Sequence, residues 1–324
     1  MIRLYDTLTG HVRPLEQRDE GKVSLYACGP TVYDHPHLGH ARQALTYDIV
    51  RRYLEWTGVD VHHVANVTDI DDNIINRANR EGSTEPEIAA TWKAVYDEAM
   101  DALDILRPHD RPHATEYVEE MVAFIETLVA NGAAYATDSG VYLRVHAVPG
   151  YGDLVHRSVD ELRDGAGARV EVDDHKEDPL DFALWKAAKA GEPTWPSPWG
   201  PGRPGWHIEC VAMSLDVLGD GFDLHGGGTD LVFPHHTNER AEAVAAGQEF
   251  ARHWMHSTDA QHRRREDEQV ARQLHDDRGS PRRTPAQRPG PAAPPPADPL
   301  PQDDGDQPHG HGTSTSQHRA ARRR

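Results

Sequence analysis

The stretch KVSLYACGPTVYDHPHLGHARQAL, residues 22–45, decides the fold that this chain can adopt. It opens with an apolar run that ends at Gly29-Pro30, which is typical of a strand followed by a turn. Pro36 stands where a helix start favours proline, and apolar residues recur at helical spacing as far as Thr57. Val59 to Val67 is predicted as a second strand. Strand, helix and strand in this order predict a βαβ unit and a parallel sheet.

The composition is acidic, with 34 Lys and Arg against 53 Asp and Glu, a formal net charge of −19. General, charge-driven binding to DNA needs a net basic face, so DNA is not expected as a partner. The sequence shows no run of about 18 apolar residues and no signal peptide, so we expect a soluble, cytoplasmic protein without a membrane partner. In that compartment its two cysteines are more often metal ligands or nucleophiles than a disulfide.

Beyond the first βαβ unit, the patterns predict helices around 86–106 and 115–130 and a hairpin in AYATDSGVYLRV, residues 134–145. A loop-rich stretch follows up to residue 205, and we predict that about 110–205 is an insertion between two halves of the sheet. Regular structure should return with three elements: a helix over 206–218, a strand at 221–224 opening onto Gly226-Gly227-Gly228, and a helix from Pro234 to about Gly247.

The character of the sequence changes after Met255. No Phe, Trp or Tyr occurs beyond Trp254, and ten of the 24 prolines lie between residues 281 and 308. Such a segment cannot bury enough apolar surface to offset its ordering entropy. The predicted organisation is therefore a folded domain over 1–258 and a disordered tail over 259–324.

Four residues of types suited to Zn²⁺ occur at positions that could converge. His235 and Glu239 are four apart near a helix start and share one face. Cys28 ends the first strand, and Cys210 lies in the helix that opens at Trp206. Two thiolates, an imidazole and a carboxylate are a suitable zinc set. The alternative, that both cysteines are small buried apolar residues, stays open at this point.

His37 and His40 stand at a helix start with Gly39 between them. A helix N-terminus offers unpaired N–H groups and a positive dipole end, which suit a phosphate. Glycine lets a ligand approach the backbone, and imidazoles can donate to charge that develops on phosphate oxygens. The alternative is a pair of capping or surface histidines.

Two further segments have both a functional and a structural interpretation. In His225-Gly226-Gly227-Gly228-Thr229-Asp230 the glycines would let adenine or ribose contact the backbone, with Asp230 accepting from ribose hydroxyls; an ordinary turn is the alternative. Thr68-Asp69-Ile70-Asp71-Asp72 could hold Mg²⁺, but acidic residues at this place favour an N-capping segment before a helix.

Taken together, these segments resemble the cysteinyl-tRNA synthetase family of class I aminoacyl-tRNA synthetases. His37-Leu38-Gly39-His40 resembles the class I His-Ile-Gly-His signature. Four other segments resemble that one family, and the likeness covers roughly residues 2–257: Cys28–Asp34, Asn66–Asp72, Gly205–Cys210 and Gly226–Leu231. The resemblance implies a class I Rossmann-like α/β domain with a parallel sheet and an inserted connective region.

The resemblance also implies roles for individual residues. One Zn²⁺ per chain would be held by Cys28, Cys210, His235 and Glu239, and His37 and His40 would act in catalysis. The residues implied in binding cysteine or ATP are Gly29, Thr31, Gly39, Trp206, His207, Gly227 and Asp230. The implied reaction joins cysteine to tRNA(Cys) through cysteinyl-adenylate, with ATP and Mg²⁺. A monomer is the default expectation, which the sequence leaves open.

The chain departs from the family pattern at several positions. Thr237 replaces a Glu between the last two ligands, and Asn73 stands where a Lys is usual. After His253-Trp254-Met255-His256 the family has a loop with Lys-Met-Ser-Lys-Ser, whereas this chain has no lysine beyond Lys189. A helical anticodon-binding domain is also expected after that loop.

A shifted reading frame would explain this departure. When Gly-Gly-Glu-Lys-Met-Ser-Lys-Ser-Leu-Gly-Asn-Phe is written in GC-rich codons and read one base out of frame, it yields Arg-Arg-Glu-Asp-Glu-Gln-Val-Ala-Arg-Gln-Leu. That is the sequence of residues 264–274. We therefore expect a frameshift near residues 257–259, equivalent to one inserted base, and poor activation of cysteine by the chain as written. The remaining alternatives are a ligase that joins cysteine to an amino sugar in mycothiol synthesis, and a non-catalytic remnant that binds zinc and cysteine.

Overall fold

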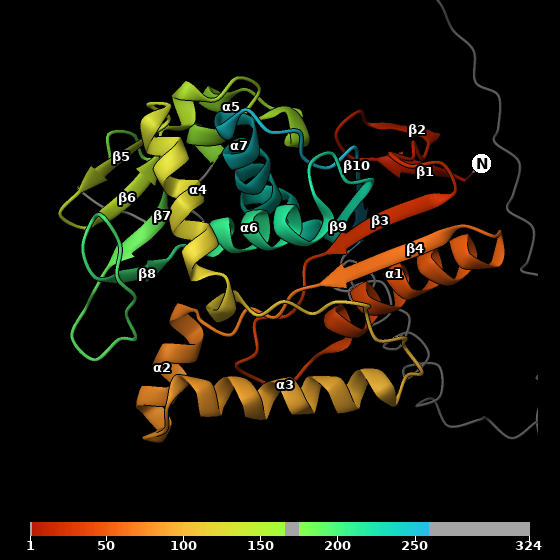
Figure 1. The fold of residues 1–324 in the computed structure, drawn as a ribbon, viewed down its shortest axis with the longest axis horizontal. Coiled ribbons are helices and arrows are strands. Elements are labelled where there is room, and N and C mark those ends of the chain that lie inside the picture. The colour runs from red at the N-terminus through yellow and green to blue at the C-terminus, as the bar shows by residue number, and fades with distance from the viewer. Residues whose placement is uncertain (1, 166–174, 259–324) are drawn as a thin grey trace, which may run out of the picture. The chain divides into compact units, whose positions relative to one another are not determined.

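A parallel four-stranded sheet carries the fold of the computed structural model, which describes residues 2–165 and 175–258. The strand order is β10-β9-β3-β4, with β3 (Lys22–Ala27) at its centre beside β4 (Asp60–Ala65) and β9 (Leu224–Gly228). β10 (His253–Ser257) lies at the edge, in register with β9. The predicted βαβ unit is confirmed: α1 (Leu38–Trp56) connects β3 to the parallel strand β4 (Figure 1).

The two faces of β3 explain how its helices are placed. Val23, Leu25 and Ala27 pack with Tyr47 and Leu54 of α1 in one core. The alternate residues Tyr26 and Cys28 belong to a second core, which also contains residues of α6 (Trp206–Leu218). Because side chains alternate along a strand, one apolar run supplies both cores. The sheet is covered by α1 on one side and by α6 and α7 (Thr237–Ala246) on the other (Figure 1).

A second, antiparallel sheet forms within the region predicted as an insertion. Its order is β5-β6-β7-β8, with bounds Ala134–Thr137, Gly140–Leu143, Phe182–Ala187 and Gly202–Pro204. The predicted hairpin is confirmed, with Asp138 and Ser139 as its loop. The prediction of loops up to residue 205 is wrong for β7 and β8, because Leu184 and Trp185 are buried against neighbouring strands and helices.

The other elements complete the described part of the chain. α2 (Asp72–Glu81), α3 (Glu85–Asp101) and α4 (Val118–Ala130) follow β4, and α5 (Val159–Gly165) follows the hairpin. β1 (Arg3–Asp6) and β2 (His11–Pro14) form a separate antiparallel pair. The predicted disordered tail lies outside the described residues.

Two boundaries predicted around β9 need correction. The glycines Gly226, Gly227 and Gly228 belong to β9 itself rather than to a turn after it. A Cβ on Gly226 would lie 2.1 Å from Tyr47 Cε1, so the strand needs glycine in order to pack against α1. The helix expected from Pro234 starts with a wide helical turn over Val232–His236, in which only Phe233 has extended φ and ψ angles, and α7 itself continues from Thr237.

Candidate active site

The carboxyl ends of β3 and β9 and the start of α1 surround a cleft of about 570 Å³. This is where open parallel sheets usually bind ligands, and the volume suits a nucleotide-sized molecule. Eight of the residues singled out in the sequence line the cleft: Cys28, Gly29, Thr31, His37, Gly39, His40, Trp206 and Asp230. Segments far apart in the chain are therefore brought together as predicted.

The four predicted zinc ligands converge at the base of this cleft. Cys28 Sγ lies 3.7 Å from Cys210 Sγ and 3.6 Å from Glu239 Oε1. His235 Nε2 lies 3.5 Å from Cys210 Sγ and 2.9 Å from Glu239 Oε1. All four side chains are buried. Tetrahedral zinc with usual bond lengths places two sulfurs about 3.8 Å apart and a sulfur and a nitrogen about 3.5 Å apart, so the donor set fits the ion.

The electrostatics of this cluster couple its members. Burial opposes ionisation of Cys210, but the neighbouring Cys28 thiol and His235 lower its pKa to about 6. Burial also disfavours charge on His235, yet Glu239 and Cys210 raise its pKa to about 10. The pKa of Glu239 is held well below its usual value, against the effect of burial, by His235, His225 and His236. The cluster is thus a set of mutually stabilised charges, which a divalent cation suits.

Three further histidines lie next to the cluster. No role was predicted for them from the sequence. His225 Nε2 lies 2.6 Å from Glu239 Oε2, and His236 Nε2 lies 3.2 Å from Cys28 Sγ. His256 bonds to His236 on the other side, at 2.8 Å. Cys28, His225, His236 and Glu239 also lie close enough to form a second ligand group. The set with two sulfurs is the better candidate for a zinc ion, because His225 and His236 would then each orient one of its ligands.

His207 and Trp206 both contact His235. The ring of Trp206 stacks on His235 with centroids 4.0 Å apart, and His207 Nδ1 lies 2.9 Å from His235 Nδ1. Trp206 lines the main cleft, whereas His207 does not and lines a smaller neighbouring cavity. The structure thus places Trp206 on the wall of the cleft and His207 against His235, one of the four predicted zinc ligands.

The two histidines at the start of α1 are stacked, with ring centroids 3.9 Å apart. His37 Nδ1 accepts from the Gly39 N–H at 3.0 Å, and His40 Nδ1 accepts from the His37 N–H at 3.2 Å. The capping alternative is therefore confirmed for His37. Burial and the neighbouring His37 lower the pKa of His40 to about 4, so its ring is neutral and carries its proton on Nε2. A neutral ring in this tautomer remains a donor.

The glycines of the site have distinct tasks. Gly29 donates its N–H to Asn66 Oδ1 at 2.7 Å, and a Cβ there would lie 1.6 Å from the Asn66 carbonyl oxygen. Gly227 does not line the cleft; a Cβ on it would lie 2.6 Å from His236 Cε1. Gly228 lines the cleft instead. Gly227 thus makes room for a buried histidine rather than for a ligand.

The acidic segment after β4 serves structural contacts. Asp71 caps α2 by accepting from the Asn73 N–H at 2.8 Å, and Asp69 accepts from the Thr115 side chain at 2.7 Å. Asp72 pairs with Lys186 and Arg203. The predicted N-cap is confirmed, and within residues 2–165 and 175–258 these carboxylates form no metal-binding group.

The two substituted positions are accommodated locally. Thr237 is buried and donates its hydroxyl to the Val232 carbonyl at 2.7 Å, which closes the turn that carries His235. Asn73 lines the cleft and donates to Asp71 at 2.8 Å. Neither residue displaces a predicted ligand.

Comparisons with known proteins agree with this geometry. The sequence model of the family "tRNA synthetases class I (C) catalytic domain" matches residues 14–275. The cysteine–tRNA ligase of Trichlorobacter lovleyi is 52% identical over 257 residues, which are 79% of this chain and 52% of that protein. The one from Halorhodospira halophila is 50% identical over 276 residues, 85% of this chain and 59% of that protein. The chain thus spans little more than half the length of these relatives.

The fold recurs in a solved structure of a different member of the class. Mycobacterium tuberculosis methionyl-tRNA synthetase in complex with methionyl-adenylate matches with a TM-score of 0.57 at 15% identity, over 73% of this chain and 57% of that chain. At this identity the likeness concerns the fold alone. Within the described residues, no helix has the length and apolar character needed to cross a membrane. With its catalytic-domain match and close relatives, the chain belongs to the cysteinyl-tRNA synthetase family of class I tRNA synthetases.

Proposed function

We propose that residues 1–258 form the catalytic domain of a cysteine–tRNA ligase. In this reaction the cysteine carboxylate attacks the α-phosphate of ATP to give cysteinyl-adenylate and pyrophosphate, and a terminal ribose hydroxyl of tRNA(Cys) then takes the cysteinyl group. The observation that carries the proposal is the convergence of the four zinc donors at the base of the cleft whose rim holds His37 and His40. The relatives named cysteine–tRNA ligase support it.

Selectivity for cysteine follows from the donor set. A zinc ion held by Cys28, Cys210, His235 and Glu239 would have four protein ligands and would have to expand to five-coordinate to bind the substrate, and it would favour a thiolate over the harder, less acidic hydroxyl of serine. Trp206 covers this end of the cleft and would close the amino-acid site above His235. Discrimination by a specific bonding group is stronger than discrimination by volume.

The rim of the cleft would position ATP. The start of α1 presents its positive dipole end to the phosphates, while the His37 and Gly39 N–H groups are already donated to His40 and His37. His37 and His40 would donate from Nε2 to the charge that develops there. Gly29 and Gly39 also line the cleft, and Thr31 and Asp230 would bind hydroxyl or ammonium groups of the substrates. Mg²⁺ would accompany ATP, and we place the reaction in the cytoplasm.

The test is binding of cysteine and serine to the full chain after loading with zinc. We expect one zinc per chain by metal analysis and cysteine binding at least about 100-fold tighter than serine binding by calorimetry. Cys210→Ser should abolish the preference, and Met213→Leu, a buried change on the same helix, should keep it. Equal binding of both amino acids by the zinc-loaded chain would contradict the proposal.

Turnover separates this function from its alternatives. Because the segment after residue 258 has no lysine to neutralise the triphosphate, we expect slow cysteine-dependent ATP–pyrophosphate exchange. Exchange at the rate of the Trichlorobacter lovleyi enzyme would contradict that expectation. Product that requires an amino sugar rather than tRNA would favour the mycothiol-type ligase, and tight cysteine binding without any adenylate would favour the non-catalytic remnant.

A further inference from the structure

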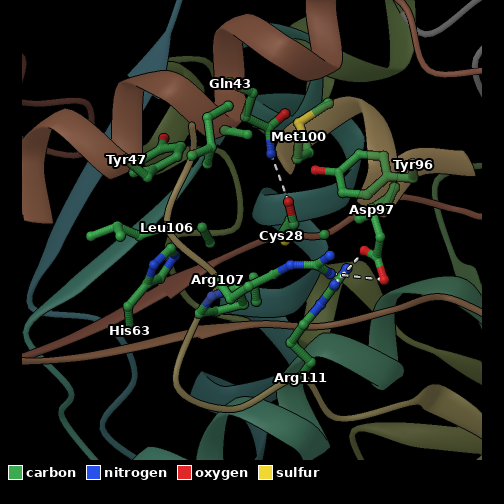
Figure 2. A pocket seen from close by; sticks show the side chains of 17 residues that line it. Cys28, Gln43, Tyr47, His63, Tyr96, Asp97, Met100, Leu106, Arg107 and Arg111 are labelled. Carbon is green, nitrogen blue, oxygen red and sulfur yellow. Dashed lines mark hydrogen bonds and ion pairs between the residues drawn. The ribbon is translucent and has the colours of Figure 1, made fainter. Parts of the chain in front are cut away.

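A second cavity lies on the face of β3 that α1 covers, behind the strand that carries Cys28 into the cleft. Its volume is about 60 Å³, and side chains from α1, β4, α3 and residues 105–111 surround it (Figure 2). A buried water needs on the order of 10–15 Å³ of such space, so the cavity has room for about five non-hydrogen atoms. Five residues line both this cavity and the main cleft, which therefore adjoin: Cys28, Gly29, Pro30, Gln43 and Tyr96.

His63 on β4 is the most unusual residue of the wall. It is only 6% exposed, and neither of its ring nitrogens has a hydrogen-bond partner within the described part of the protein. Burial, together with nearby Arg51 and His109, lowers its pKa to about 3, so the ring is neutral and offers one donor and one acceptor. Buried polar groups are nearly always bonded, and an unbonded one costs free energy.

Arg111 adds a second buried group that needs a partner. Its Nε has no hydrogen-bond partner among the described residues, although its terminal nitrogen pairs with Asp97 at 2.5 Å. In Figure 2, His63 and Arg111 enter from the side opposite to Gln43 and Tyr47. Two unpartnered groups, one of them a guanidinium N–H, therefore line the same small space.

The charge around the cavity is positive. Asp97 is paired with three cations, Lys93 at 2.8 Å, Arg107 at 2.9 Å and Arg111. Asp101 also pairs with Arg107, which leaves three cations against two carboxylates. Of the charged residues that line the cavity itself, Arg107 and Arg111 outnumber the single carboxylate of Asp97, so the wall has a net positive charge that an anionic occupant would balance.

Six apolar side chains make up much of the remaining wall. Ala27, Ala44, Ala65, Met100, Ile105 and Leu106 line the cavity. Such a surface favours a hydrocarbon part in the occupant, since water would gain few hydrogen bonds there.

We propose that this cavity binds a short-chain monocarboxylate, with its carboxylate near His63 and Arg111 and its alkyl part against Met100 and Leu106. The ligand class follows from three features together: unpartnered donors, surplus positive charge and an apolar wall of limited size. Cys28 also lines the cavity, so propionate binding is measured by itself, and its failure would not bear on the proposed ligase activity.

Propionate, which has five non-hydrogen atoms, is the probe, and propionamide is its neutral counterpart. We expect calorimetry on the full chain to give millimolar binding of propionate, as is usual for about five atoms, and at least about tenfold weaker binding of propionamide. A crystal soaked with propionate should show it beside His63. Equal affinity for the two compounds, or only water in the cavity of the soaked crystal, would overturn the proposal.

Two variants and one control sharpen the test. His63→Leu should weaken propionate binding at least tenfold, and Leu106→Trp should block it by filling the space. His62→Leu is the matched control, because His62 is the preceding residue on β4, does not line the cavity and pairs with Asp110. Unchanged propionate affinity in both folded cavity variants, or an equal loss in His62→Leu, would refute the assignment.

Discussion

The two carboxylate oxygens of Glu239 have different partners in the candidate metal cluster. Oε1 faces His235 and Cys28, while Oε2 accepts from His225 Nε2 at 2.6 Å. His225 itself lies among aromatic rings, stacked on Trp254 at 4.6 Å between centroids. A ligand carboxylate held in this way is oriented before the ion arrives, which raises affinity.

Replacing His225 should therefore weaken zinc binding without unfolding the protein. In His225→Phe the ring stacking with Trp254 is kept, but Oε2 of Glu239 loses its donor. We expect zinc affinity to fall about 10- to 100-fold, measured by competition with a chromophoric chelator. His253→Phe, a buried change on β10 away from the ligands, should leave it within about twofold. An unchanged zinc affinity in His225→Phe would show that this histidine does not orient the ligand.

The end of β3 depends on close contact with the segment that follows β4. Gly29 donates to Asn66 Oδ1, and its Cα faces the Asn66 carbonyl so closely that no side chain fits. Cys28 is the residue before it and is fixed by an N–H donated to the Gly226 carbonyl at 2.9 Å. The thiol position thus depends on backbone packing between strands.

Gly29→Ala should disturb both stability and zinc binding. The new Cβ would overlap a backbone oxygen at 1.6 Å, so we expect a loss of about 3 kcal/mol or more in the free energy of unfolding, measured by denaturant titration. Gly132→Ala is the control, since it meets open space and costs only about 1 kcal/mol from its positive φ. Equal losses for the two variants would argue against the strand contact.

Ion pairs of Asp97 connect α3 with residues 105–111. Although its burial opposes ionisation, Lys93 and Arg111 lower its pKa from 3.8 to about 2. A depressed folded-state pKa stabilises the fold above the unfolded value near 4, and this contribution is lost as the pH falls towards 2.

Asp97→Asn should remove this contribution. At pH 7 we expect the variant to be about 1–2 kcal/mol less stable, after allowance for solvent screening. The difference from the parent should be constant down to about pH 4 and shrink below it, measured by urea unfolding at each pH. A difference that grows as the pH falls would contradict the assigned direction.

The described part of the chain contains both the metal cluster and the nucleotide-sized cleft, but it spans little more than half of its relatives. β10 ends at Ser257, and Thr258 accepts a hydrogen bond from Arg42 on α1. Contacts with the rest of the domain thus continue to Thr258, the last described residue. For the residues beyond it, the off-frame origin remains our proposal.

Sequencing the gene across codons 250–280 tests that proposal directly. We expect one surplus base near codons 257–259. Its deletion should restore Lys-Met-Ser-Lys-Ser and raise cysteine-dependent ATP–pyrophosphate exchange by at least about 100-fold, since the restored lysines would stabilise the triphosphate charge. The same deletion combined with Cys210→Ser should remain inactive. If no single-base deletion yields that motif, the frameshift explanation is wrong.

Local patterns in the chain were sufficient to predict the βαβ unit, α1, α6 and the β5–β6 hairpin. The spacing of apolar residues and the effect of turn residues depend only on nearby positions in the sequence. They failed at β7 and at β9. A short strand with glycines resembles a turn until its neighbours, Tyr47 and His236, are known. At α7 the prediction from Pro234 missed that a wide helical turn over Val232–His236 precedes the regular helix from Thr237.

The residues of the site also fall into those predicted from the sequence and those found only in the structure. Residue types and motif likeness pointed to Cys28, Cys210, His235 and Glu239, and these four were found together. Nothing in the local sequence indicated His225 and His236 as their partners, the position of His207 behind His235, or the unpartnered His63. Those features arise from the packing of strands and helices distant in sequence, and a hydrogen bond between such residues leaves no trace in local spacing.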